Sequence, residues 1–164
     1  SHNLAGNVKK EISIDHMAIK GLPEFLATIS QEYTKRVLPD YLPEGTKVAF
    51  RVWTVSQVAG DFNPIHIHDS NLSGVCFLKI PPKFDEEYSK EDHHPTAGCL
   101  EFIGSIPNHF ARHSFLVKPE VGDFYIFPSW LTHQVYPFRS DGERRSMAFN
   151  VHFTMENPMK GVNV

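Results

Sequence analysis

Three histidines have the residue type and spacing that could hold a metal ion. The chain has ten histidines in 164 residues, and His66 and His68 stand two apart in Asn63-Pro64-Ile65-His66-Ile67-His68-Asp69. Side chains two apart on a strand point to the same face, so the two imidazoles would lie side by side. His133 follows Trp130-Leu131-Thr132 much later in the chain. Two histidines from one strand and one from elsewhere are typical of a mononuclear metal site with open positions.

The third ligand has an alternative in Asp69. This carboxylate directly follows His68, and it would face the other side unless the strand ends there. If His66, His68 and His133 are the ligands, three neutral groups leave the full +2 charge of the metal, which an anionic co-substrate could offset. One of the three could instead be a hydrogen-bonded core residue, as a single histidine often is.

A cationic fork and a hydroxyl follow on a later predicted strand. Arg144 and Ser146 are two apart, and Arg144 comes eleven residues after His133. A guanidinium with a neighbouring hydroxyl suits a carboxylate held at two points. Ala148 and Asn150 would continue this polar face along a cavity, with Met147, Phe149 and Val151 packed outside. Alternatively, Arg144 and Arg145 are a solvated pair after the Asp141-Gly142 turn, and we expect Arg145 to be solvated in either case.

Other polar and aromatic residues could line the same site. The candidates are Trp53, Gln57, Asn63, Trp130 and Asn150. For the two tryptophans, packing in the core is the competing interpretation.

The elements that must position these residues are one helix followed by many short strands. Pro23 can open a helix, and apolar residues at helical spacing continue it to Leu38. From Lys47 the period changes to two. The predicted strands are 12–16, 47–55, 65–68, 74–80, 99–103, 114–117, 124–127, 133–137 and 145–154, separated by Gly and Pro turns. This order predicts a mostly β chain closed into a sandwich or barrel.

We expect one domain with three parts. Residues 1–44 would be a helical support, residues 45–154 the β domain and residues 155–164 a tail. The polar, acidic stretch Lys83–Ala97 interrupts the strands and is expected to be a loop, either a plain surface insertion or a substrate lid.

Composition and charge favour an ordinary globular protein over several other classes. Hydrophobic residues make up 41% and charged residues 21%, and the formal net charge is −3. Without a basic block we expect no nucleic-acid partner, and without an apolar run of about 20 residues no membrane partner. Cys76 and Cys99 lack metal spacing, so we expect free buried thiols in a reducing compartment, the cytoplasm.

Four segments together resemble a known family. They are N-P-I-H-I-H at 63–68, N-L-S-G-V-C-F-L-K-I-P at 71–81, K-P-E-V-G-D-F-Y-I-F-P-S-W-L-T-H-Q-V-Y-P at 118–137 and G-E-R-R-S-M-A-F-N at 142–150. Over residues 45–154 the chain resembles the 2-oxoglutarate/Fe(II) oxygenases of the prolyl-hydroxylase-like superfamily found in bacteria and in viruses of marine cyanobacteria. The resemblance implies a double-stranded β-helix, or jelly roll, with the metal inside one mouth.

The resemblance also implies roles for individual residues. His66 and His133 would be iron ligands, and Arg144 with Ser146 would hold the distal carboxylate of 2-oxoglutarate. The wider superfamily has H-x-D or H-x-E where this chain has His66-Ile67-His68, so His68 and Asp69 both stay candidates for the third ligand. The implied cofactors are Fe(II), 2-oxoglutarate as co-substrate and O2, and the implied reaction is hydroxylation of a substrate C–H. If the chain is viral, its compartment is the host cytoplasm.

Two other functions fit part of the pattern. A cupin-like dioxygenase with three histidines and no 2-oxoglutarate explains His68 better but leaves Arg144 and Ser146 without a role. A non-catalytic jelly roll that binds a metal or small ligand is the other. A small-molecule or peptidyl substrate fits the oxygenase equally well, and a dimer is compatible with the sequence.

Overall fold

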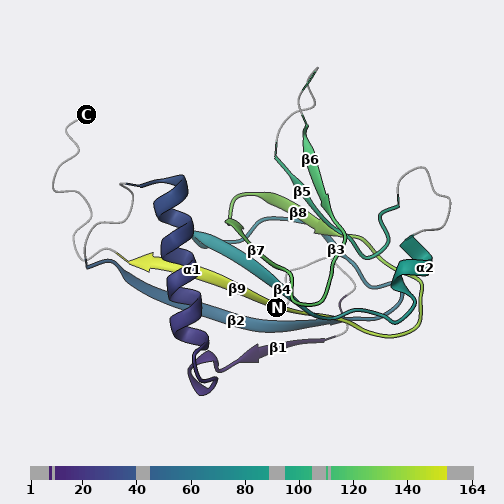
Figure 1. Ribbon diagram of the computed structural model, residues 1–164, viewed down its shortest axis with the longest axis horizontal. Helices are drawn as coiled ribbons and strands as arrows, with labels where there is room; N and C mark the ends of the chain where they lie inside the picture. Colours follow the sequence, from purple (N-terminus) through teal and green to yellow (C-terminus); the bar gives the residue numbers. More distant parts are fainter. Residues whose placement is uncertain are drawn as a thin grey trace.

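The β domain consists of two antiparallel sheets. The computed structural model describes residues 8, 10–39, 45–88, 95–104, 110 and 112–154. A five-stranded sheet has the order β1-β2-β9-β4-β7, and a four-stranded sheet the order β3-β8-β5-β6 (Figure 1). The strands are β1 Lys10–Ile14, β2 Lys47–Gln57, β3 Asn63–His66, β4 Leu72–Lys79, β5 Leu100–Ile103, β6 Ser114–Val117, β7 Phe124–Pro128, β8 Thr132–Val135 and β9 Arg144–Thr154. The predicted mostly β double-stranded β-helix is confirmed.

Helix α1 (Leu22–Val37) packs on the outer face of the five-stranded sheet. It lies across β2, β9 and β4 in Figure 1. Its Leu26 is fully buried in a cluster with Leu72 of β4 and Phe149 of β9. The predicted helix is confirmed, but Phe25, Val37 and Leu38 of its expected apolar face are about half exposed.

Small hydroxyl residues take the place of those apolar residues on the buried face of α1. Ser30 and Thr34 follow Leu26 at intervals of four residues and are buried. Each hydroxyl donates to a carbonyl four residues earlier, Ser30 Oγ to Leu26 O at 2.7 Å and Thr34 Oγ1 to Ser30 O at 2.8 Å. A hydroxyl that bonds inside its own helix can be buried without an unsatisfied donor.

The second apolar cluster fills the space between the two sheets. It joins Phe77 of β4 and Phe127 of β7 to residues of the four-stranded sheet, namely Leu100, Phe102, Val117 and Val135. Strand β9 pairs with β2 over its full length. Its side chains point alternately into this interior and toward the helix. Arg144 and Ser146 are therefore on the inner side, and Phe149 and Val151 under the helix.

Gly74 is the point of closest approach between β4 and the ring of Phe149. A Cβ at Gly74 would lie 2.2 Å from a Phe149 ring atom and 2.8 Å from the Tyr125 carbonyl oxygen. Phe149 is fully buried, so its ring has little room to move.

Gly74→Ala is expected to lower the free energy of unfolding by about 1–3 kcal/mol, the scale of overpacking a core. Urea denaturation measures it. Gly104→Ala is the matched control, because a Cβ there meets nothing within 4 Å. Equal stability of the two variants would show that the Gly74 contact is not a constraint.

The structure corrects several predicted boundaries. The first strand ends at Ile14, and His16 opens a 3-10 helix over His16–Ala18 that is capped by Asp15. His68 lies just beyond β3. A short helix, α2 (Phe84–Tyr88), occupies part of the stretch predicted to be loop.

Helix α2 forms because its residues have partners in the β domain. Phe84 is buried, and Glu87 accepts bonds from the backbone N–H groups of Arg139 and Ser140. Residues 89–94 of the stretch interpreted as a surface insertion or a lid lie outside the described residues, and so does the predicted tail at 155–164.

Both cysteines are free, as predicted, but only Cys99 is buried; Cys76 is half-buried. Within the described part of the chain, no helix is long and apolar enough to cross a membrane.

Candidate metal centre and anion pocket

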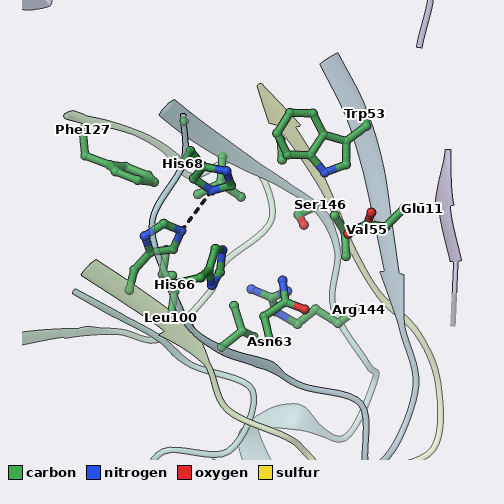
Figure 2. Close-up of a pocket in the computed structure, with 15 residues that line it drawn as sticks. Glu11, Trp53, Val55, Asn63, His66, His68, Leu100, Phe127, Arg144 and Ser146 are labelled. Atoms are coloured by element: carbon green, nitrogen blue, oxygen red, sulfur yellow. Dashed lines mark hydrogen bonds between the residues drawn. The ribbon is translucent and has the colours of Figure 1, made fainter. Parts of the chain in front are cut away.

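His66, His68 and His133 meet in one pocket between the sheets. One ring nitrogen of each lies within 4.8 Å of one from each of the others. The His68 and His133 Nε2 atoms are 3.2 Å apart, and the ring centroids of His66 and His133 are 4.2 Å apart. Figure 2 shows His66 and His68 at one side of the pocket, with Arg144 and Ser146 across from them.

Pairing between β3 and β8 brings these histidines together. His66 is directly opposite His133 in the antiparallel register. The register shifts between Asn63 and His66, and such a bulge lets residues three apart line the same pocket. His68 is held beyond the strand end by its backbone N–H, which donates to Ser129 O at 3.0 Å.

Hydrogen bonds to carbonyls orient two of the rings. His66 Nδ1 is 2.7 Å from Pro64 O, and His133 Nδ1 is 2.8 Å from Leu131 O. A carbonyl can only accept, so each Nδ1 carries the proton and each Nε2 of the neutral rings is unprotonated. The Nε2 of His133 then accepts from His68 Nε2. Bonds of this kind fix the tautomer and direction of metal-binding histidines.

Burial keeps two of these imidazoles uncharged. Desolvation, helped by the neighbouring histidines, lowers the pKa of His68 to about 3. Desolvation also lowers the pKa of His133 to about 4, although the bond to Leu131 opposes the shift. Both rings are therefore neutral at pH 7, the state in which imidazole binds metals.

Acidification is expected to destabilise the metal-free protein. Unfolded histidines take up protons near pH 6.5, whereas folded His68 and His133 stay neutral until about pH 3 and 4. Between these values the unfolded state binds more protons, so the free energy of unfolding falls as the pH falls. Urea denaturation at pH 7 and pH 5 measures this loss, which should shrink in His68→Gln/His133→Gln. An undiminished loss in that variant would assign it to other groups.

Arg144 supplies a buried positive charge across the pocket. Its side chain is 2% exposed, and its guanidinium carbon lies 4.9 Å above the ring of Phe77. Burial lowers the pKa of Arg144 to about 10, so it remains a cation at neutral pH. Arg144 Nη1 donates to Gln57 Oε1 at 2.5 Å. Among the described residues no carboxylate pairs with this cation.

Polar atoms near Arg144 have no partner. Arg144 Nε, Gln57 Nε2 and Asn63 Oδ1 are buried without a hydrogen bond among the described residues. Unsatisfied buried groups cost free energy, and several in one place indicate a site shaped for a polar ligand. An anion with more than one oxygen would meet the unused donors.

Five of the predicted site residues besides the histidines have clear places in this geometry. Trp53, Asn63, Arg144 and Ser146 line the pocket. Gln57 does not line it but lies behind Arg144 as its hydrogen-bond partner.

Three other candidates lie outside the pocket lining. Asn150 is buried and accepts from Ser73 Oγ at 2.9 Å. Trp130 is 68% exposed because it lies in the turn between β7 and β8. Asp69 is exposed and is not part of the group of potential metal ligands. Arg145, expected to be solvated, is exposed and bonds to Glu143.

Glu11 is a pocket residue that was not predicted from the sequence. Glu11 lies on β1 opposite Val55 of β2, and both line the pocket. In Figure 2 they stand on the side of Ser146 away from the histidines. The predicted first strand began at Ile12 and so left Glu11 out, and no local pattern says that this strand joins the edge of the sheet.

The family is shown by comparison of sequences. A family profile described as "Putative 2OG-Fe(II) oxygenase" matches residues 51–150. This span includes the three histidines, Arg144 and all or part of every strand except β1. The chain therefore belongs to this family of 2-oxoglutarate/Fe(II) oxygenases. No curated protein sequence matches it significantly.

Solved structures share the fold at low sequence identity. A Pseudomonas putida prolyl-4-hydroxylase is similar over 87% of this chain and 67% of its own, with a TM-score of 0.56 and 19% identity. A Burkholderia pseudomallei oxidoreductase of the 2OG-Fe(II) oxygenase family matches over 87% and 66%, with a TM-score of 0.51 and 14% identity. HygX from Streptomyces hygroscopicus with nickel and 2-oxoglutarate bound matches over 88% and 72%, with a TM-score of 0.52 and 10% identity. The chain thus spans about two thirds of their length.

Proposed function

We propose that the protein is a 2-oxoglutarate- and Fe(II)-dependent dioxygenase that hydroxylates a C–H bond of a peptidyl or small-molecule substrate. The observation that carries this proposal is the position of Arg144, which is buried and has no carboxylate partner among the described residues, across one pocket from three converging imidazoles. Metal and carboxylate sites on opposite sides of one pocket suit a short dicarboxylate that also chelates a metal.

His66, His68 and His133 would hold the iron. Their nitrogens converge, and the Nδ1 bonds of His66 and His133 leave the Nε2 of both rings unprotonated, as metal binding requires. A protein shell of three ligands leaves room on the metal for co-substrate and O2. His68 is the third ligand of this proposal, because Asp69 is outside the cluster.

Arg144 and Ser146 would hold the far carboxylate of 2-oxoglutarate. The guanidinium has an unused N–H, and the hydroxyl lines the same wall. A carboxylate there would also neutralise a cation that is otherwise buried without a counter-ion, which is a costly state. When bound, iron supplies the oxidation: O2 and 2-oxoglutarate give succinate, CO2 and a hydroxylated substrate.

A cupin-like dioxygenase that does not use 2-oxoglutarate is the second candidate. It is favoured by one observation, that a third histidine stands where the superfamily has a carboxylate. It gives Arg144 no function, so we rank it below the first.

An assay of succinate formation tests the proposal, and the same assay can identify the substrate. Purified protein with Fe(II), 2-oxoglutarate and O2 should form succinate, and a true substrate should accelerate this. Proline-containing peptides are the first to test, since a prolyl-4-hydroxylase shares the fold, and free amino acids are the next. Oxygen consumption that does not depend on 2-oxoglutarate would favour the cupin-like enzyme.

The setting of this reaction follows from the sequence. We place it in the cytoplasm, or in a host's cytoplasm if the chain is viral, because two free thiols and a ferrous site suit reducing conditions. The proposed partner is the substrate alone, without nucleic acid or membrane, and a dimer is compatible with it.

A further inference from the structure

A buried cluster of polar side chains lies next to the metal centre. It consists of Ser70, Ser73, Ser129 and Asn150, which we call the serine cluster. Ser129 Oγ is 2.6 Å from Ser70 Oγ and 3.2 Å from Ser73 Oγ. Ser73 Oγ donates to Asn150 Oδ1 at 2.9 Å. Ser73 and Ser129 are each 1% exposed, and Asn150 is 8% exposed.

The serine cluster joins four parts of the chain. Ser73 comes from β4 and Asn150 from β9. Ser70 belongs to the segment that follows His68, and Ser129 to the turn that leads into β8 and His133. The cluster therefore lies where the chain segments of two proposed ligands meet the five-stranded sheet.

Backbone bonds connect Ser129 directly to both segments. Its carbonyl accepts from His68 N at 3.0 Å, and its N–H donates to Asn71 O at 3.2 Å. Asn71 in turn is fixed to β9, because Asn71 N donates to Val151 O and Asn71 Oδ1 accepts from Phe153 N. A change in the position of Ser129 would therefore move His68.

Apolar residues could fill this part of the core, but they would not fix the relative positions of the chain segments that meet there. Hydrogen bonds have direction, and a satisfied buried network specifies one arrangement of the segments it joins. His68 and His133 lie on two such segments, and their Nε2 atoms are only 3.2 Å apart.

We propose that the serine cluster is a positioning device for the metal centre, with Ser129 at its middle, that sets the spacing between His68 and His133. Ser129 is a positioning residue, because it touches neither the pocket nor a ligand nitrogen. The inference rests on the proposed function, since it requires that these histidines bind a metal.

Cobalt(II) binding by Ser129→Ala tests the proposal. Removal of a residue that supports metal ligands typically weakens metal affinity 10- to 100-fold, and we expect a loss on this scale together with an altered visible spectrum of the bound Co(II). Ser30→Ala is the matched control. It also deletes a fully buried, hydrogen-bonded hydroxyl, but in helix α1, and it should leave affinity and spectrum unchanged.

A second variant covers the case in which Ser129→Ala does not fold. Asn150→Leu keeps much of the side-chain volume and removes the bond to Ser73, and it should also weaken Co(II) binding relative to Ser30→Ala. Affinities and spectra equal to those of Ser30→Ala would overturn the proposal. Failure of the unaltered protein to bind Co(II) would overturn the proposed function itself, and the inference with it.

Discussion

His133→Ala should lose essentially all iron while keeping the fold. His133 is 4% exposed, and its Nε2 lies 3.2 Å from that of His68. With one ligand of three removed, the remaining pair cannot hold Fe(II) against water and buffer. The iron retained after anaerobic loading and desalting measures the effect, and circular dichroism reports the fold.

A histidine on the other sheet provides the control for this loss. His152 lies on β9 with an exposed side chain, so His152→Ala should retain iron in full. Iron content of His133→Ala equal to that of His152→Ala would contradict the ligand assignment and favour a site elsewhere.

Arg144→Ala should weaken binding of 2-oxoglutarate by about 2–4 kcal/mol, the scale for breaking a buried charged pair. This corresponds to roughly 30- to 700-fold in Kd. Arg144→Lys keeps the charge but not the planar fork, so it should recover only part of the affinity. Calorimetric titration of the iron-loaded or cobalt-loaded protein without oxygen measures Kd.

The neighbouring arginine is the control for charge alone. Arg145 is exposed and bonds to Glu143, so Arg145→Ala should leave Kd nearly unchanged. The opposite order, with Arg145→Ala the weaker binder, would show that the anion is held outside the pocket.

A period-two pattern predicts a strand where one face is buried, and the alternation from Lys47 onward agrees with the structure. The strand 114–117 is also present, although Phe115 and Leu116 are both exposed. Strand ends were less predictable, since they depend on pairing. His16 was expected to continue the first strand, but Asp15 caps a 3-10 helix there. Helix α2 depends on contacts with residues some fifty positions later, which no local pattern reveals.

The candidate site was predictable where its residues stand two apart in an extended segment. Alternation placed His66 with His68 and Arg144 with Ser146, and the pocket contains both pairs, although His68 lies just beyond the end of β3. The roles of Gln57 and Asn150 were not predictable, because their partners Arg144 and Ser73 come from other strands. Trp130 was a candidate for lining the site because it is aromatic, but it lies in the turn between β7 and β8 and is exposed.

The most direct test of the account is the visible charge-transfer band of an iron–2-oxoglutarate complex. Fe(II) and 2-oxoglutarate are added to the metal-free protein without oxygen, separately and together. We predict a band that needs both components and is lost in His133→Ala. Iron binding without such a band would contradict the use of 2-oxoglutarate, and no iron binding would contradict the metal centre.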